Sequence, residues 1–167
     1  MRARSGRAWL RAGVVFAVVV AVDQATKAIV RSSIPRGGSE KFFIGINLVN
    51  TRNKGVAFGL LAGGGGVVIA IIGVALVALT VYFATHVDKP LLWLPTGLLL
   101  GGAVGNLLDR VRGDAVTDFI DLPLWPPFNV ADMAITFGVL TLLYALEAPR
   151  ARRGREKASH DDPHEAS

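Results

Sequence analysis

Four long apolar segments, separated by polar connections, dominate the hydropathy pattern of the chain. They cover residues 12–30, 66–85, 91–108 and 130–146, and each approaches the roughly 20 residues that an α-helix needs to cross the hydrocarbon core of a bilayer. All four are rich in Gly, Ala and Val, and small residues allow helices to approach closely within lipid. The pattern therefore predicts an all-α membrane protein built as a bundle of four transmembrane helices.

The C-terminal segment, residues 150–167, differs in composition from the rest of the chain. It is basic and lacks apolar periodicity, and such segments bury too little apolar surface to offset the loss of chain entropy on folding. We therefore expect a single membrane domain in residues 1–149, followed by a disordered basic tail.

The N-terminus also has features of a secretory signal peptide, because a basic start precedes a short apolar core. Asp23 and Lys27, however, occupy the region where small uncharged residues would lead to a cleavage site, and three further apolar segments follow. The first apolar segment is therefore interpreted as a retained helix.

The distribution of Lys and Arg predicts the orientation of the helices. The chain has 18 Lys and Arg residues and a net charge of +5. If both termini lie on one side, ten of these residues lie on that side, seven lie on the other, and Lys27 is inside the first helix. The positive-inside rule then places both termini in the cytoplasm. Anionic lipid headgroups are nearer to these basic residues than nucleic acid would be, so we expect membrane lipids and no nucleic acid as partners.

The inventory of reactive side chains restricts the possible chemistry. The chain has no cysteine, its histidines are His86, His160 and His164, and no serine lies in the second, third or fourth apolar segment. The chain therefore lacks the side chains for a thiol nucleophile, and it offers few suitable residues for a Ser–His pair or for a zinc site built from His or Cys. We expect no metal and no other cofactor, and a hydrolase built from this chain would use carboxylates as its acid and base.

Two groups of polar residues interrupt the apolar segments. Asp23 and Lys27 are four residues apart, so they share a helix face and can form a salt bridge that fixes the first helix against its neighbours. Asn106, Asp109 and Arg110 share one face at the outer end of the third segment. This second group fits either support for a functional site or an ordinary interfacial helix end with charges that reach the headgroups.

Asp118 and Asp132 lie on the two sides of a Pro-rich return. Asn129 and Asp132 have the spacing of a helix N-cap and its capping box, and capping alone would explain both residues. The return nevertheless brings Asp118 back toward the helix that carries Asp132. Two carboxylates held close in a partly dry site share one proton, and such a pair can activate water for peptide hydrolysis without metal, thiol or imidazole.

Five short motifs together resemble the prolipoprotein signal peptidase family, also called signal peptidase II, whose members are bacterial membrane aspartyl endopeptidases. In order, they are DQATK at 23–27, NKGVAF at 53–58, GNLLDR at 105–110, VTDFID at 116–121 and FNVAD at 128–132. The resemblance covers residues from about 12 to 147. The sequence departs from the family pattern at Val56 and Gly59, in the segment before the second helix.

The resemblance implies roles for nine residues. The catalytic pair carries over to Asp118 and Asp132. The supporting polar residues around that pair and the substrate carry over to Asp23, Lys27, Asn53, Asn106, Asp109, Arg110 and Asn129. The family also places a small extracytoplasmic β-rich element between helices 1 and 2, and residues 40–49 are β-prone enough to form it.

The resemblance also implies the substrate and the location. Family substrates are prolipoproteins that carry a diacylglyceryl group on a cysteine, and cleavage falls just before that cysteine. The cyclic lipopeptide globomycin, an inhibitor of the family, would occupy the same cleft. We expect a multi-pass monomer in the bacterial plasma (inner) membrane, with its site near the extracytoplasmic surface.

Two other functions fit part of the pattern. A small proton-coupled transporter or lipid carrier would use Asp23, Lys27, Asp109 and Asp132 as a relay. Such a protein typically has internal repeats and acids near the bilayer midplane, whereas these acids cluster at one level and no repeat is visible. A purely structural membrane subunit would leave the arrangement of Asp118 and Asp132 without a use.

Overall fold

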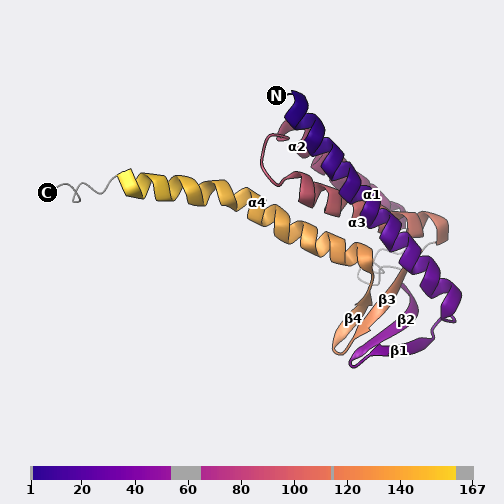
Figure 1. Ribbon diagram of the computed structural model, residues 1–167. Helices are drawn as coiled ribbons and strands as arrows, with labels where there is room; N and C mark the ends of the chain where they lie inside the picture. Colours follow the sequence, from indigo (N-terminus) through magenta and orange to yellow (C-terminus); the bar gives the residue numbers. More distant parts are fainter. Residues whose placement is uncertain (1, 54–64, 114, 161–167) are drawn as a thin grey trace.

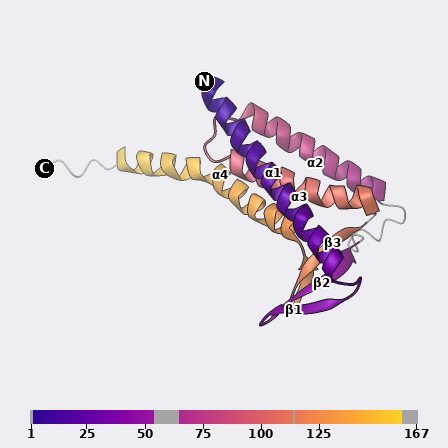
Figure 2. The ribbon, with the colours of Figure 1, turned by 45° about the vertical axis from the view of Figure 1, so that its right-hand side comes forward.

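The computed structural model describes residues 2–53, 65–113 and 115–160, and its main elements are four helices. These are α1 (Arg2–Ser33), α2 (Gly65–Thr85), α3 (Trp93–Gly113) and α4 (Val130–His160). A small sheet lies at one end of the helices, and the N-terminus and the α2–α3 connection lie at the other end (Figures 1 and 2). The prediction of a helical protein with a small β element is therefore confirmed.

The sheet is larger than the sequence predicted. Its four antiparallel strands, in spatial order, are β1 (Ser39–Phe43), β2 (Ile46–Asn53), β3 (Val116–Leu122) and β4 (Trp125–Phe128). The predicted element between the first two helices corresponds to β1 and β2, but β3 and β4 belong to the α3–α4 connection. The two prolines of β4 are tolerated because β4 is an edge strand and its pairing with β3 is irregular between Trp125 and Phe128, where the prolines lie.

Helix α3 packs against both α1 and α4, and glycines make this close packing possible. A Cβ atom on Gly101 would lie 2.8 Å from Cβ of Val19, and one on Gly105 would lie 2.7 Å from Oδ2 of Asp23. On the α4 side, a Cβ on Gly102 would lie 2.5 Å from a backbone carbonyl oxygen. Only glycine allows these approaches, which bring the polar residues of three helices together.

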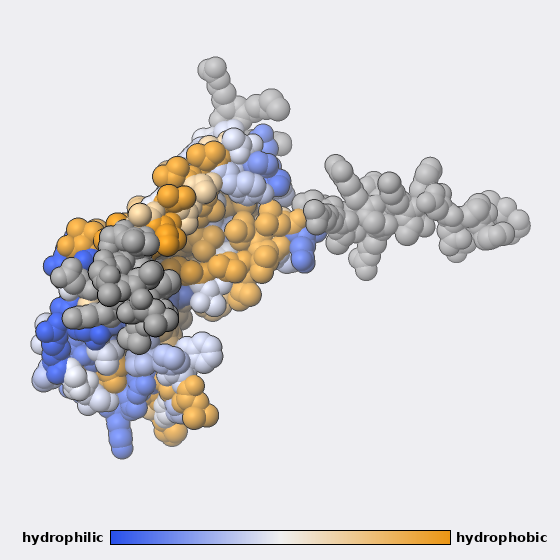
Figure 3. Space-filling view, turned by 180° about the vertical axis from the view of Figure 1, so that it is seen from behind, coloured by the Kyte–Doolittle hydropathy of each residue, from blue (hydrophilic) through white to orange (hydrophobic). Residues whose placement is uncertain are grey.

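The helices carry an apolar band. Orange apolar residues cover the middle of the helical part in Figure 3, and blue hydrophilic residues gather toward its two ends. Within the part of the chain that the structure describes, two helical segments are long and apolar enough to cross a bilayer, Ser5–Ser33 and Val130–Glu147. The described apolar part of α2, Ile69–Thr85, is shorter. Four membrane crossings therefore remain a prediction.

Helix α4 corrects the predicted start of the tail. The helix continues to His160, whereas the sequence predicted a helix end near 146 and a disordered tail from 150. Ala, Arg, Glu and Lys dominate this stretch and are strong helix formers, and they extend a helix that already exists, which requires no new nucleation. Residues 161–167 lie outside the described residues.

Candidate active site

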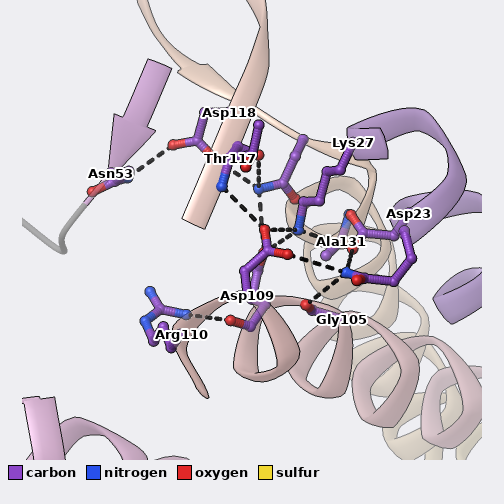
Figure 4. Close-up of polar contacts among 12 residues, drawn as sticks. Asp23, Lys27, Asn53, Gly105, Asp109, Arg110, Thr117, Asp118 and Ala131 are labelled. Carbon is purple, nitrogen blue, oxygen red and sulfur yellow. Dashed lines mark hydrogen bonds and ion pairs between the residues drawn. The ribbon is translucent and has the colours of Figure 1, made fainter. Parts of the chain in front are cut away.

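The candidate site lies where α1, α3, β3 and the start of α4 meet, at the sheet end of the helices (Figure 4). Helix α1 contributes Asp23 and Lys27, α3 contributes Asn106 and Asp109, β3 contributes Asp118, and the α4 start contributes Asn129 and Asp132. The structure therefore brings together polar residues from four separate segments.

Lys27 lies at the centre of a buried ionic group. Its Nζ atom is 2.9 Å from Oδ2 of Asp23 and 3.1 Å from Oδ2 of Asp109, and it donates a hydrogen bond to Oδ1 of Asn106 at 3.0 Å. These three acceptors match the three donors of an ammonium group. Asp23 also accepts a hydrogen bond from the backbone N–H of Ala131 in α4, at 2.9 Å. The predicted salt bridge is confirmed, and it joins α1 to both α3 and α4.

Three residues that the sequence reasoning missed complete the surroundings of Asp109. The backbone N–H of Thr117 donates to Oδ2 of Asp109 at 3.1 Å, and the Gln24 amide donates to Oδ1 at 3.3 Å. A guanidinium nitrogen of Arg31 lies 3.6 Å from the same Oδ1. Gln24 and Thr117 each adjoin a candidate aspartate within a motif, and this adjacency could have identified them from the sequence. Arg31 is one helical turn beyond Lys27, so helical periodicity could have identified it.

Amide groups hold Asp118 and Asp132 in one network. Asp118 accepts hydrogen bonds from the side-chain amides of Asn129 at 2.7 Å and Asn53 at 2.9 Å. Asp132 accepts from the Asn106 side chain at 2.8 Å and from the backbone N–H of Asn129 at 3.2 Å. Asn129 therefore contacts both carboxylates. Among the described residues, neither carboxylate forms an ion pair.

Asp132 also has the helix-capping role predicted from its spacing. Its backbone N–H donates to Oδ1 of Asn129 at 3.0 Å, and the backbone N–H of Asn129 donates in return to Oδ2 of Asp132 at 3.2 Å. This reciprocal pair is a capping box. Capping uses only one of the two carboxylate oxygens of Asp132, and the other faces Asn106. Asp132 therefore caps the helix and at the same time belongs to the amide network.

Burial raises the pKa of Asp118, which lies on β3 outside the helices. The desolvation of its carboxylate is the largest influence, and the negative charge of Asp132 acts in the same direction. Hydrogen bonds from Asn53 and Asn129, and to a smaller extent the positive charge of Lys27, stabilise the carboxylate and oppose the rise, but the net shift is upward. Asp118 therefore keeps its proton to a higher pH than an ordinary aspartate.

This shift predicts how the stability effect of Asp118→Asn depends on pH. An aspartate whose pKa is higher in the folded state stabilises the fold most below its unfolded pKa, about 3.9, and that contribution is lost as the pH rises through the folded pKa. The asparagine does not titrate. We expect the wild-type Tm minus the variant Tm to decrease as the pH rises from about 4, measured by thermal unfolding in detergent micelles. A difference that stays constant or grows with pH would contradict the raised pKa.

Two parts of the predicted site, Arg110 and the segment after Asn53, are not shown to contact the candidate catalytic pair. The Arg110 guanidinium donates to the backbone carbonyl oxygen of Asn106 at 3.2 Å, within its own helix, and forms no ion pair within the described residues. Asn53 contacts Asp118, but residues 54–64 lie outside the described residues. The remainder of the NKGVAF motif, with Val56, and the departure at Gly59 are therefore not placed.

An apolar cavity adjoins Asp132. It has a volume of about 330 Å³. Apolar and aromatic side chains form most of its wall, and the complete lining is Leu122, Trp125, Phe128, Asp132, Met133, Thr136 and Phe137. The Asp132 carboxylate, which is partly exposed, thus borders a space suited to apolar groups.

The family comparison and the curated relatives agree on one family. The family described as signal peptidase (SPase) II matches residues 15–147. The lipoprotein signal peptidase of Moorella thermoacetica is 44% identical over 146 residues, which cover 83% of this chain and 94% of the relative. That of Nitratidesulfovibrio vulgaris is 38% identical over 152 residues, covering 84% and 92%. A solved structure titled as a bacterial membrane enzyme has a TM-score of 0.77 and 33% identity, covering 81% of this chain and 91% of that chain.

Proposed function

This chain belongs to the signal peptidase II family, which removes signal peptides from prolipoproteins, and we propose that it does so as an aspartyl endopeptidase with Asp118 and Asp132 as its catalytic pair. Asp23, Lys27, Asn53, Asn106, Asp109 and Asn129 hold the pair in place. The enzyme has several membrane crossings, with both termini in the cytoplasm and the site near the extracytoplasmic surface of the bacterial inner membrane.

One observation carries the choice of Asp118 and Asp132 among the four aspartates of the site. Asp23 and Asp109 each lie within 3.1 Å of the Lys27 ammonium, so their charges are compensated. Asp118 and Asp132 receive hydrogen bonds from neutral amides instead. Two neighbouring carboxylates that contact no cation among the described residues do not both ionise easily, so one retains a proton while the other acts as a base.

The surroundings of Asp118 and Asp132 indicate which residue is the general acid and which is the general base. The raised pKa of Asp118 favours the proton on this residue at the start of the cycle, so Asp118 is the general acid. Asp132, which borders the cavity, takes a proton from water as the water oxygen attacks the peptide carbonyl carbon. Asp118 donates its proton to the carbonyl oxygen during this attack, which gives a gem-diol intermediate. Asp132 then passes the proton it took from water to the leaving nitrogen, the C–N bond breaks, and a hydroxyl of the gem-diol returns a proton to Asp118 as the product carboxyl group forms. One water molecule is consumed, and both carboxyl groups return to their starting states.

The cavity beside Asp132 supports a lipid-modified substrate. Its aromatic and aliphatic wall fits an acyl chain or the apolar residues that surround the cleavage point. An enzyme that holds the diacylglyceryl group there would present the bond before the modified cysteine to the catalytic pair. Globomycin-type lipopeptides would compete for the same space.

A transporter has less support from the structure. Asp23 and Asp109, two acids of the alternative relay, lie together at the sheet end of the helices (Figure 4), and Asp132 is joined to them through Asn106. A transport relay would place acids near the middle of the bilayer.

Substrate dependence tests the proposed function directly. We expect the purified protein to cleave a precursor with a diacylglyceryl-modified cysteine at the bond before that cysteine, and to leave the same unmodified precursor intact. Mass spectrometry of both products identifies the bond, and a globomycin-type inhibitor should block the cleavage. Equal cleavage of both precursors would contradict recognition of the lipid.

A further inference from the structure

A second cavity lies at the other end of the helices, between the first turns of α1 and the α2–α3 connection. Its volume is about 730 Å³. The basic residues in its wall are Arg7, Arg11 and Lys89, and the acidic residue there is Asp88. The wall therefore carries an excess of two positive charges.

The position of this cavity matches the opposite membrane surface. Arg7 and Lys27 are roughly 20 residues apart on one helix, which corresponds to about 30 Å along its axis at 1.5 Å per residue. This is about the thickness of the hydrocarbon core of a bilayer. With the candidate active site at one surface, the second cavity lies at the headgroup level of the other leaflet.

Neutral aromatic groups hold two of the three cations. The Arg11 guanidinium lies 5.7 Å from the centroid of the Trp93 ring. The Lys89 ammonium donates to the Tyr82 hydroxyl at 3.1 Å and lies 5.5 Å from the centroid of the Tyr82 ring. Within the described residues, Arg7, Arg11 and Lys89 form no ion pair. Aromatic groups therefore orient two of the positive charges in this wall, and no carboxylate of the described residues forms an ion pair with them.

We propose that this cavity binds the phosphate group of an anionic phospholipid from the leaflet on the N-terminal side. Guanidinium groups bind phosphate through two parallel hydrogen bonds, and Arg7 and Arg11 are one helical turn apart. Trp and Tyr are typical of the headgroup level. Val87, Pro90 and Leu91 add apolar wall, which suits the start of the acyl chains and distinguishes a lipid from a soluble anion.

Native mass spectrometry of the full chain in neutral detergent tests this site. We expect one phosphatidylglycerol molecule to stay bound in preference to phosphatidylcholine. Arg7→Gln with Arg11→Gln should weaken phosphatidylglycerol binding roughly 30-fold, from the typical contribution of each basic residue near an anionic surface. The matched control, Arg36→Gln with Lys41→Gln, removes two exposed charges at the sheet end and should change binding less than about 3-fold.

Further measurements separate the possible sources of binding. Equal losses in the two double variants would overturn the site in favour of diffuse attraction, and displacement of the lipid by millimolar inorganic phosphate would overturn the lipid as the ligand. Lys89→Gln, with an unchanged Tm, provides an independent variant that should also weaken binding. Cleavage of a modified precursor in detergent should stay unchanged in all these variants, so failure of this proposal is distinguishable from failure of the proposed function.

Discussion

Asp118→Asn and Asp132→Asn should each lower the rate of prolipoprotein cleavage by about 10³-fold or more, because each removes a group that gives or takes a proton in the transition state. The asparagines keep the size of the side chain and can still accept a hydrogen bond, so the amide network around Asn129 retains partners. Initial cleavage rates of purified variants on a diacylglyceryl-modified precursor measure the effect.

Asp121→Asn is the matched control for this pair of variants. Asp121 lies on the same strand as Asp118, three residues further on, and accepts a hydrogen bond from Asn47 at 3.3 Å. It contacts neither Asn106 nor Asn129 by a hydrogen bond in the described part of the chain. We expect its activity to stay within about 3-fold of wild type. Near-normal turnover by either catalytic variant, with a wild-type Tm, would rule out the two-aspartate mechanism.

Local sequence patterns predicted the parts of the structure that depend on local rules. Apolar segments of helical length identified the helices, the spacing of Asp23 and Lys27 predicted their salt bridge, and Asn129 with Asp132 predicted the capping box. Each of these features follows from residues within one or two helical turns. Their geometry can therefore be read without knowledge of the fold.

Strands β3 and β4, which the sequence did not predict, depend on contacts between distant residues. Thr51 lies opposite Asp118 in the β2–β3 ladder, and no local pattern specifies a pairing between residues so far apart in the chain. Thr117, by contrast, is only eight residues from Asp109, and its N–H reaches that carboxylate because β3 begins three residues after α3 ends. The polar residues of the site were predicted as a list from the family resemblance, but which of the carboxylates contact Lys27 and which contact only amide groups could be seen only in the folded geometry.

Lys27→Met should cause the largest loss of stability among single substitutions in the site. Its ammonium is fully buried, and its removal leaves Asp23 and Asp109 without their shared cation, a change that typically costs about 3–5 kcal/mol in the free energy of unfolding. Thermal or denaturant unfolding in micelles measures this loss. Lys41→Met, at an exposed position on β1, should change the stability by less than about 0.5 kcal/mol.

A double variant distinguishes lost charge compensation from lost packing. Compared with Lys27→Met alone, the combination of Asp23→Asn with Lys27→Met also removes the uncompensated charge of Asp23. The amide oxygen of the asparagine can still accept the hydrogen bond from the backbone N–H of Ala131. Asp109 keeps the Arg31 guanidinium at 3.6 Å. If charge dominates, the double variant should be more stable than Lys27→Met alone, with a coupling energy of about 1–3 kcal/mol. Purely additive losses would mean that Lys27 acts through its packed stem, and the ionic group would then not be what holds α1 against α3 and α4.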